Sequence, residues 1–415
     1  MRILWITGTS SSKRKSYGGG GWIRSLSKRI VQTKGMELAC AFFYDADVDA
    51  FKKDGVWQYP MYLPIESGVA KVLRYWTGIG EKAREEKKLS LMKSVIVQFK
   101  PDIIQVFGTE SNGASLIGNT DVPVVLYIQG LVNPIYNAYY PIGMTDAIVK
   151  SICKDKNEWI FNNGIVYRHH ELKQLADREK EIFGKVKYVI GRTHFDFQVS
   201  RLFAPQSKYY KLNEAMRSSF YSEDSWKKKE RVTYKLLSTV SSVTYKGIDV
   251  ILKAAKLLSD NHVSFEWRIA GISTPSKIMG LFEEYTGIKA NEVNVECLGV
   301  VGEEDLKNYL LDSDVYVHSS YIDNSPNSVG EAQLLGVPVI ACNVGGVSDF
   351  VKDGETGKLI PSNDPYDLAY LVIKDLQEPY LYQYSEKSKE EALRCHDTEV
   401  IFKDLCFIYQ DIIDK

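Results

Sequence analysis

The stretch Asp323–Gly346, DNSPNSVGEAQLLGVPVIACNVGG, predicts how the second half of the chain folds. The apolar run DVYVHSS stands before it and predicts a strand, the residues up to NSPNS predict a loop, and VGEAQLLG predicts a helix. Gly336 suits the left-handed position after a helix, Pro326 suits a first helical turn, and Pro338 begins another buried strand. Strand, loop, helix and strand in this order are typical of a parallel sheet covered by helices.

Short apolar runs alternate with helical patterns along the rest of the chain. The first half contains RILWITG, LACAFFYD, PDIIQVFG, VPVVLYIQG and VKYVIGRT, and the second contains KLLSTVSS, FEWRIAG and VNVECLGVV. None alternates with period two, which suits strands buried on both faces of a parallel sheet. The polar stretch after residue 205 predicts an interdomain connection. We therefore expect the α/β class, with two doubly wound, Rossmann-like domains over residues 1–210 and 211–395 that bind ligands at the carboxyl ends of their strands.

The composition excludes several classes of protein. The 415 residues are 44% hydrophobic and 25% charged, which is ordinary for a globular chain. No apolar run approaches the roughly 18 residues of a membrane span, and MRILWITGTSSSKRKSY is too polar for a signal peptide, so we expect a cytoplasmic protein. Six scattered cysteines predict reduced thiols. No residue cluster has metal-ligand spacing, and we expect no metal or other cofactor.

The formal net charge of −1 hides an asymmetry between the two halves. Residues 1–210 contain 30 Lys and Arg against 20 Asp and Glu, net +10, whereas residues 211–415 contain 22 against 33, net −11. A basic half favours an anionic partner, such as a membrane surface or a phosphate-bearing acceptor. The alternative, that these side chains only solvate helix surfaces, stays open. No nucleic-acid motif is present, so we expect no nucleic-acid partner.

Two carboxylates with seven residues between them define the chemistry expected of the opening stretch. A carboxylate can hold vicinal hydroxyls of a sugar by charge-assisted hydrogen bonds, and the N–H groups of a helix N-terminus can hold a diphosphate. Asp323 and Glu331 therefore suit a nucleotide-sugar. The alternatives are that Glu331 forms a capping box with Ser328 and that Asp323 is a solvated loop residue.

From about Tyr234 to Val372 the chain resembles the C-terminal domain of the retaining glycosyltransferases of family four. The resemblance is carried by TYKGIDVILKAAKLL, FEWRIAG, ECLGVV, DVYVHSS, VSDFVKDGETGKLI and the opening stretch, with its two carboxylates, GVPV and paired glycines. It implies the GT-B fold, two facing Rossmann-like domains with an interdomain cleft, and a last helix, about 396–415, that packs back on the N-terminal domain. Over the N-terminal half the resemblance is mainly topological.

The resemblance also implies roles for individual residues. Glu331 would bind the ribose, Asp323 would face the donor sugar, and Lys246 would hold the diphosphate; these three are the expected catalytic residues. An alternative reading of Lys246 is a first-turn residue pointing to water. The remaining donor-binding residues would be Gly20 and Gly21 in the glycine-rich loop, Gly299, Val300 and Val301 at the base, and Ser325, Pro326, Asn327, Ser328 and Val329 along the donor.

Three positions depart from the family pattern. Asp323 replaces a Glu, Ser241 stands where an Arg often precedes the Lys, and Gln129 stands where many members have His. Gln can donate and accept hydrogen bonds but cannot act as a base near neutral pH. Arg192 or Arg217 could supply the missing cation, and His194 could lie near the acceptor.

The sequence thus predicts a retaining glycosyltransferase. It would move a sugar from a UDP- or GDP-sugar to a glycan or lipid-linked acceptor in surface polysaccharide biosynthesis, as a peripheral protein on the inner face of the plasma membrane. In a front-face mechanism the leaving phosphate accepts the acceptor's proton, so no strong base is required. The alternatives are a nucleotide-sugar epimerase, a phosphorylase, or a catalytically inactive sugar-nucleotide-binding protein.

Overall fold

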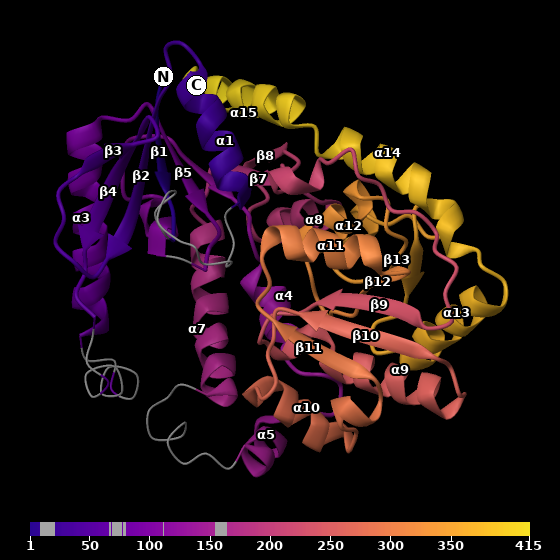
Figure 1. Ribbon diagram of the computed structural model, residues 1–415. Helices are drawn as coiled ribbons and strands as arrows, with labels where there is room; N and C mark the ends of the chain where they lie inside the picture. The colour runs from indigo at the N-terminus through magenta and orange to yellow at the C-terminus, as the bar shows by residue number, and fades with distance from the viewer. Residues whose placement is uncertain (9–20, 66–67, 69–76, 78–79, 111, 154–163) are drawn as a thin grey trace. The chain divides into compact units, whose positions relative to one another are not determined.

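The computed structural model describes residues 1–8, 21–65, 68, 77, 80–110, 112–153 and 164–415. Its contacts divide the chain into two compact units (Figure 1). The first unit comprises Met1–Asn133, Asp155–Ala215 and Asp397–Lys415, and the second comprises Pro134–Lys154 and Met216–His396. The expected domain limits differ from this division because Pro134–Lys154, which carries no strand signal, groups with the second unit.

The first unit contains an eight-stranded sheet in the order β3-β4-β2-β1-β5-β6-β7-β8. All neighbouring strands are parallel except the edge pair β3–β4. The five predicted strands are present, but β3, β4 and β8 were not predicted, and β8 lies in the stretch expected to be a connection. The strands are β1 (Arg2–Ile6), β2 (Glu37–Tyr44), β3 (Phe51–Lys53), β4 (Val56–Tyr62), β5 (Ile103–Phe107), β6 (Val124–Tyr127), β7 (Tyr188–Gly191) and β8 (Lys208–Lys211).

Helices cover both faces of this sheet, which explains the continuous apolar runs. Side chains alternate along β1: Ile3 and Trp5 pack with α1 and α15, while Leu4 and Ile6 pack with α3, α7 and α8. All four side chains are almost fully buried. The helices are α1 (Gly21–Gln32), α3 (Glu81–Phe99), α7 (Ile165–Phe183), α8 (His194–Phe203) and α15 (Thr398–Ile413).

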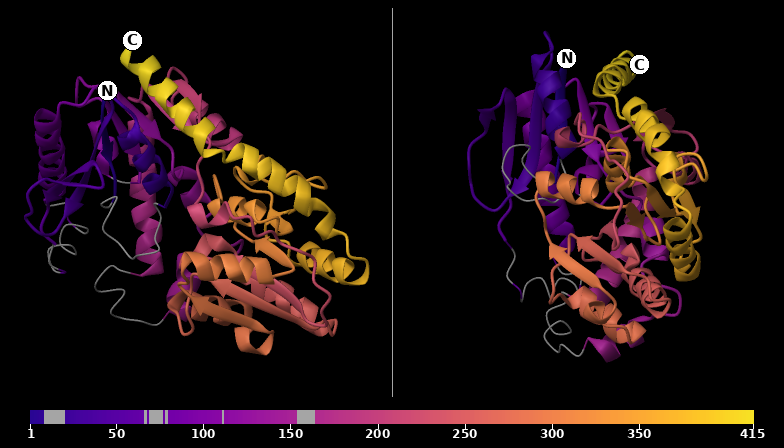
Figure 2. Two further views of the ribbon diagram at one scale, coloured as in Figure 1. Left: turned by 45° about the horizontal axis from the view of Figure 1, so that its top comes forward. Right: turned by 45° about the vertical axis from the view of Figure 1, so that its right-hand side comes forward.

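The C-terminal region forms two helices where the sequence predicted one. The pattern EALRCHDTEVIFKDLCFIYQDII is interrupted between α14 (Ser385–Cys395) and α15. Asp397 causes the break, because its carboxylate accepts hydrogen bonds from the backbone N–H groups of Glu399 and Val400 and so caps a new helix. This new helix, α15, lies beside α1 (Figure 2).

A buried hydrogen-bond relay joins α15 to the centre of the first sheet. The Tyr409 hydroxyl accepts from the Trp5 indole N–H at 2.9 Å and donates to the Gln105 side-chain oxygen at 2.6 Å. All three side chains are 0–1% exposed. The C-terminal helix is therefore fixed by polar as well as apolar contacts.

The second unit contains a six-stranded, fully parallel sheet in the order β11-β10-β9-β12-β13-β14. The architecture confirms the expected α/β class with two parallel-sheet domains. Its strands are β9 (Tyr234–Thr239), β10 (Phe265–Ala270), β11 (Val295–Gly299), β12 (Val315–His318), β13 (Val339–Cys342) and β14 (Lys358–Ile360). Its further helices are α4 (Val132–Asn137), α5 (Asp146–Ile152), α9 (Ile248–Asp260), α10 (Lys277–Thr286), α11 (Glu303–Asp312), α12 (Asn327–Leu334) and α13 (Pro365–Gln377).

Short 3-10 turns complete both units: η1 (Asn112–Leu116), η2 (Ser218–Phe220), η3 (Thr244–Lys246), η4 (Ala290–Glu292), η5 (Val347–Asp349) and η6 (Leu381–Tyr384). The segment that carries α4 and α5 packs on the second unit through η3 and α10. The Thr244 hydroxyl donates to the Tyr139 carbonyl, and the Tyr285 hydroxyl donates to the Ile142 carbonyl at 3.2 Å. Among the described helices, none has both the length and the apolar character needed to cross a membrane.

We expect Tyr409→Phe to lower the free energy of unfolding by about 2–4 kcal/mol, because it leaves the Trp5 N–H and the Gln105 amide buried without their shared partner. Urea denaturation measures this change. Phe407→Leu on the same helix is the control, since Phe407 is exposed and should change stability by less than about 0.5 kcal/mol. Equal effects of the two substitutions would contradict the relay's importance.

Candidate functional site

Residues predicted to act together meet at the carboxyl edge of the second sheet. Lys246 follows β9, Asp323 follows β12, and Gly299 ends β11. Because all strands are parallel, the loops that follow them leave from the same edge. The sequence-predicted donor residues are therefore carried by loops at one edge of one sheet.

Two glycines are required for the backbone of this edge to pack. Gly345 has φ +54°, and a Cβ atom there would lie 2.1 Å from the Asp323 carbonyl oxygen, which accepts a hydrogen bond from the Gly346 N–H at 3.0 Å. Gly247 has φ +71°, and a Cβ atom there would lie 1.9 Å from the Ser319 carbonyl oxygen. The paired glycines of the opening stretch thus hold the loop after β13 against the Asp323 backbone.

Asp323 is partly buried in a charged cluster. Its Oδ2 accepts a hydrogen bond from Lys246 Nζ at 2.6 Å and lies 3.2 Å from His318 Nε2. Burial acts to raise the pKa of Asp323, but Lys246 and His318 outweigh it and hold the pKa well below its usual range. Burial likewise acts to lower the pKa of Lys246, and the Asp323 charge reverses this, so the Lys246 pKa is raised. The solvent-facing readings of Asp323 and Lys246 are wrong.

Glu331 is 4% exposed and pairs with Arg217. Arg217 Nε donates to Oε1 and Nη2 donates to Oε2, each at 2.6 Å, which is the planar two-bond geometry of an arginine and a carboxylate. The capping-box alternative is wrong, because α12 starts two residues earlier than a Ser328 cap requires. Pro326 occupies the N-cap position and no side chain caps the helix. The Ser328 hydroxyl instead hydrogen-bonds with Tyr316.

The N-terminus of α12 presents polar atoms that lack partners. Ser325 Oγ and Asn327 Oδ1 are buried and accept or donate no hydrogen bond among the described residues. Buried polar atoms are normally paired, so such atoms at a helix N-terminus indicate a place for a polar ligand. Pro326, Ser328 and Val329 share this turn, although Val329 is fully buried in the hydrophobic core.

The loop expected at the base is braced by residues that the sequence did not single out. Gly299 has φ +73°, Val300 is 66% exposed, and Val301 packs partly on the core. Beyond them, Glu303 Oε1 in the first turn of α11 accepts hydrogen bonds from the Ser219 N–H, at 3.2 Å, and from the Ser219 hydroxyl. Ser219, Glu303 and His318 had no sequence signal of their own, because isolated Ser, Glu and His are common in loops and helix starts.

The first unit carries the residues predicted near the acceptor. Gly20 lies outside the described residues, and Gly21 is the first residue of α1. Arg192 is buried, pairs with Glu214, and donates to the Gln129 carbonyl at 2.6 Å. Burial acts to lower the pKa of Arg192, but Glu214 outweighs it and the pKa is raised.

Some of the residues predicted near the acceptor or the diphosphate take no part in the contacts between Arg192, Glu214 and Gln129. His194 is the exposed first residue of α8, and its ring stacks on Phe197 at 6.0 Å. Ser241, where the family often has a cation, is exposed. Arg192 and Arg217, the two arginines considered as its replacement, each pair with a buried carboxylate instead of standing free.

Two further carboxylates, Glu110 in the loop after β5 and Glu179 on α7, were missed from the sequence. Glu179 is fully buried and accepts hydrogen bonds from the Thr109 hydroxyl and from the N–H groups of Val132 and Asn133 at 2.6–2.9 Å. Glu110 is hydrogen-bonded to the Gly130 backbone, and burial, followed by smaller effects that include the nearby Glu179 charge, raises its pKa to about 7.

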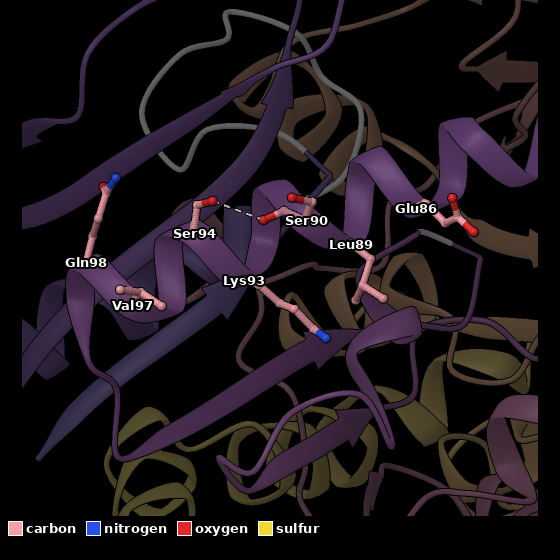
Figure 3. Close-up of a pocket in the computed structure, with 7 residues that line it drawn as sticks. All are labelled: Glu86, Leu89, Ser90, Lys93, Ser94, Val97 and Gln98. Carbon is pink, nitrogen blue, oxygen red and sulfur yellow. Dashed lines mark hydrogen bonds between the residues drawn. The ribbon is translucent and has the colours of Figure 1, made fainter.

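A shallow hollow elsewhere on the first unit contains neither the predicted site residues nor Glu110 and Glu179. It runs along one side of α3 (Figure 3) and is lined by Glu86, Leu89, Ser90, Lys93, Ser94, Val97 and Gln98. One helix supplies all seven side chains, and none belongs to the predicted site.

Comparison with known proteins identifies the second unit. Residues 221–393 match the family model described as glycosyl transferases group 1. The matched segment contains Lys246, Asp323, Glu331 and the paired glycines. The chain carries a group 1 glycosyltransferase domain.

Curated relatives of this glycosyltransferase domain match part of the chain. WcaL of Escherichia coli (strain K12), a candidate colanic acid biosynthesis glycosyltransferase, is 26% identical over 184 residues, which are 42% of this chain and 44% of WcaL. The match therefore spans less than half the length of that relative.

Solved structures extend the similarity in fold to the whole chain. Sucrose-phosphate synthase from Thermosynechococcus elongatus has a TM-score of 0.70 at 16% identity and covers 100% of this chain and 99% of its own. Anabaena HepE in complex with UDP-glucose has a TM-score of 0.59 at 15% identity and covers 99% and 100%. These similarities confirm the GT-B fold for the chain that carries the glycosyltransferase domain.

We expect Glu110 to make stability pH-dependent. An unfolded Glu loses its proton near pH 4.5, whereas folded Glu110 keeps it until about pH 7. Between these values the unfolded state binds fewer protons, so the free energy of unfolding falls as pH rises from about 4.5 to about 7. Glu110→Gln removes this contribution. The free energy of unfolding of the variant minus that of the parent should therefore be about 1–3 kcal/mol higher at pH 8 than at pH 5.

Urea unfolding of both proteins at the two pH values measures the difference. Glu378→Gln, an exposed position at the end of α13, is the control and should show the same difference from the parent at both pH values. A Glu110→Gln difference that does not change with pH would show that Glu110 titrates normally.

Proposed function

We propose that the protein is a retaining glycosyltransferase that uses a UDP- or GDP-sugar and acts on a glycan or lipid-linked acceptor in surface polysaccharide biosynthesis. The observation that carries the proposal is the pair of buried carboxylate–cation contacts, Asp323–Lys246 and Glu331–Arg217, within the group 1 glycosyltransferase segment. A site that keeps two carboxylates ionised beside two cations offers acceptors for sugar hydroxyls and donors for phosphate oxygens.

Each part of a nucleotide-sugar has a counterpart among these residues. Glu331 accepts the ribose hydroxyls, while Lys246 and the N–H groups at the start of α12 hold the diphosphate. The unpartnered Ser325 Oγ and Asn327 Oδ1 complete their hydrogen bonds on the donor. The complex of HepE with UDP-glucose supports a nucleotide-sugar donor, since that protein shares the fold over its full length.

Lys246 supplies the main electrostatic contribution to the reaction. When the bond between the sugar anomeric carbon and the diphosphate breaks, negative charge develops on the leaving oxygen, and a fixed cation stabilises that charge more than the ground state. The acceptor hydroxyl oxygen bonds to the same face of the anomeric carbon, and its proton passes to a phosphate oxygen of the leaving group. Gln129 therefore needs only to hydrogen-bond, which suits its chemistry.

The first unit provides a basic surface for an anionic partner. Counted over the residues of each unit, the first has 31 Lys and Arg against 25 Asp and Glu, net +6, and the second has 21 against 28, net −7. The asymmetry is smaller than between the halves of the sequence, because the acidic residues 397–415 belong to the first unit. The first unit is still net positive and the second net negative. We therefore include binding to an anionic membrane surface in the proposal.

Glu331→Gln should weaken nucleoside diphosphate binding by about 10- to 100-fold, because a neutral amide loses the charge-assisted bonds to ribose. A thermal-shift titration with UDP and GDP measures it, since a ligand of the folded state raises the melting temperature. The change caused by ligand is compared within each variant, because loss of the Arg217 partner also lowers the melting temperature without ligand. Glu390→Gln, exposed on α14, is the control.

Turnover then separates the proposed function from the other enzyme classes. The parent should transfer or slowly hydrolyse a donor sugar with retained anomeric configuration, read by NMR. Conversion of the sugar nucleotide without an acceptor would indicate an epimerase, and dependence on free phosphate would indicate a phosphorylase. Binding without turnover of any donor would indicate an inactive sugar-nucleotide-binding protein.

We expect the protein to co-sediment with vesicles that contain anionic phospholipid at about 0.1 M salt and to be released at about 1 M salt, where the Debye length falls from about 10 to about 3 Å. Vesicles of neutral phosphatidylcholine are the control and should bind little protein at either salt concentration. Equal binding to both kinds of vesicle, or binding that salt does not weaken, would contradict the electrostatic part of the proposal.

A further inference from the structure

Arg217 makes the most specific contact to the expected ribose-binding carboxylate. Its two hydrogen bonds to Glu331 join residues 114 positions apart in the sequence, from the edge of η2 to the second turn of α12. The Arg217 side chain is 27% exposed, whereas that of Glu331 is 5% exposed. Burial acts to lower the pKa of Arg217, but Glu331 outweighs this effect and the pKa is raised, so the pair is charged.

The arginine is itself held from several sides. Its guanidinium lies over the ring of Phe220, 4.8 Å from the centroid, and the Phe220 ring is fully buried. Ser219, two residues after Arg217, donates its backbone N–H to the Glu303 carboxylate at the start of α11. On the other side, the Met216 N–H donates to the Tyr221 hydroxyl at 2.8 Å. These contacts fix the position from which the guanidinium reaches Glu331.

A carboxylate at the end of a flexible side chain would otherwise sample several orientations. The planar guanidinium fixes the plane of the Glu331 carboxylate, which a point charge such as a lysine ammonium cannot do. Each ionised carboxylate oxygen can accept more than one hydrogen bond, so pairing with Arg217 is compatible with binding a hydroxyl. Pre-organised acceptors bind a ligand more tightly because less ordering is needed on binding.

We infer that Arg217 is a positioning residue for nucleotide recognition, which holds the Glu331 carboxylate ionised and oriented toward the ribose 2′- and 3′-hydroxyls of the donor. The inference rests on the proposed function of Glu331. Arg217 lies outside the segment 221–393 that matches the family, close to Met216, where the second unit resumes after the first.

The test is the preference for ribose over 2′-deoxyribose. Dissociation constants for UDP and 2′-deoxy-UDP, and for GDP and 2′-deoxy-GDP, are measured on the full chain by calorimetry. We expect the parent to prefer the ribonucleotide by about 10- to 100-fold, the contribution of one hydrogen bond to a charged group. Arg217→Met and Arg217→Lys should both reduce this preference toward the value of Glu331→Gln.

The preference is a ratio measured on one protein, so it is insensitive to partial unfolding of a variant. This matters because Arg217→Met leaves a buried carboxylate without its cation, whereas Arg217→Lys keeps a cation beside it and tests the inference if Arg217→Met does not fold. Arg231→Met is the matched control: Arg231 is ion-paired with Asp312 and Asp314 elsewhere in the second unit, and its loss should leave the preference unchanged.

The outcomes separate the inference from its premise. An unchanged preference in both Arg217 variants would show a purely structural role, and tighter ribonucleotide binding by Arg217→Met would show that Arg217 competes with ribose; either result overturns the inference. If the parent binds nucleoside diphosphates but Glu331→Gln keeps the parental preference, the ribose role of Glu331 fails. If the parent binds none of the four nucleotides, the proposed function fails and the inference with it.

Discussion

A buried carboxylate stays ionised only when a cation or several N–H groups compensate its charge, and this constraint organises the candidate site. Asp323 is compensated by Lys246, which arrives from the loop after the neighbouring strand β9. Glu331 is compensated by Arg217, which arrives from the start of the second unit. The first pair joins residues 77 positions apart, and the second joins residues 114 positions apart. The charges therefore also fix how the loops at the sheet edge lie.

The first unit shows the same constraint met in three ways. Glu214 is compensated by Arg192, and Glu179 accepts backbone N–H groups at the start of α4 in addition to hydroxyl and amide donors. Glu110 has no ion pair among the described residues, and its pKa is correspondingly raised to about 7. Burial of the Glu110 carboxyl is thus not offset by an ion pair, which accounts for the direction of its pKa shift.

Much of the fold, and the position of Lys246, Asp323 and Gly299 at one edge of the second sheet, could be predicted, because both rest on local patterns. Apolar runs marked β1 and β9 correctly, and the spacing of Asp323, Glu331 and the glycines marked the turn at α12. The partners could not be predicted. Arg217 was considered as a cation for phosphate, yet its contact to Glu331 depends on packing across 114 residues. In the sequence, His318 belongs to a predicted strand. Its contact with the Asp323 carboxylate forms only because Asp323 folds back over the strand end.

Two of the strands that were missed share a physical cause. Strands β3 and β8 lie at the edges of the first sheet, where one side is unpaired and polar residues are tolerated. Their sequences, FKK and KYYK, therefore give no apolar run. The segment Pro134–Lys154 has no periodic signal in the sequence, and its contacts with η3 include the hydrogen bond from the Thr244 hydroxyl to the Tyr139 carbonyl. Thr244 lies two residues before Lys246.

The contacts of Asp323 explain the effect of a side chain one methylene shorter than the expected Glu. Its backbone carbonyl is held by Gly346, and its side chain is held by Lys246 and His318, so the carboxylate lies close to its own turn. One methylene fewer than a Glu reduces its reach beyond Lys246. Under the proposed function, Asp323 therefore acts on the donor mainly by orienting Lys246 toward the diphosphate, and selection among donor sugars falls to the groups beside it, the unpartnered Ser325 hydroxyl first among them.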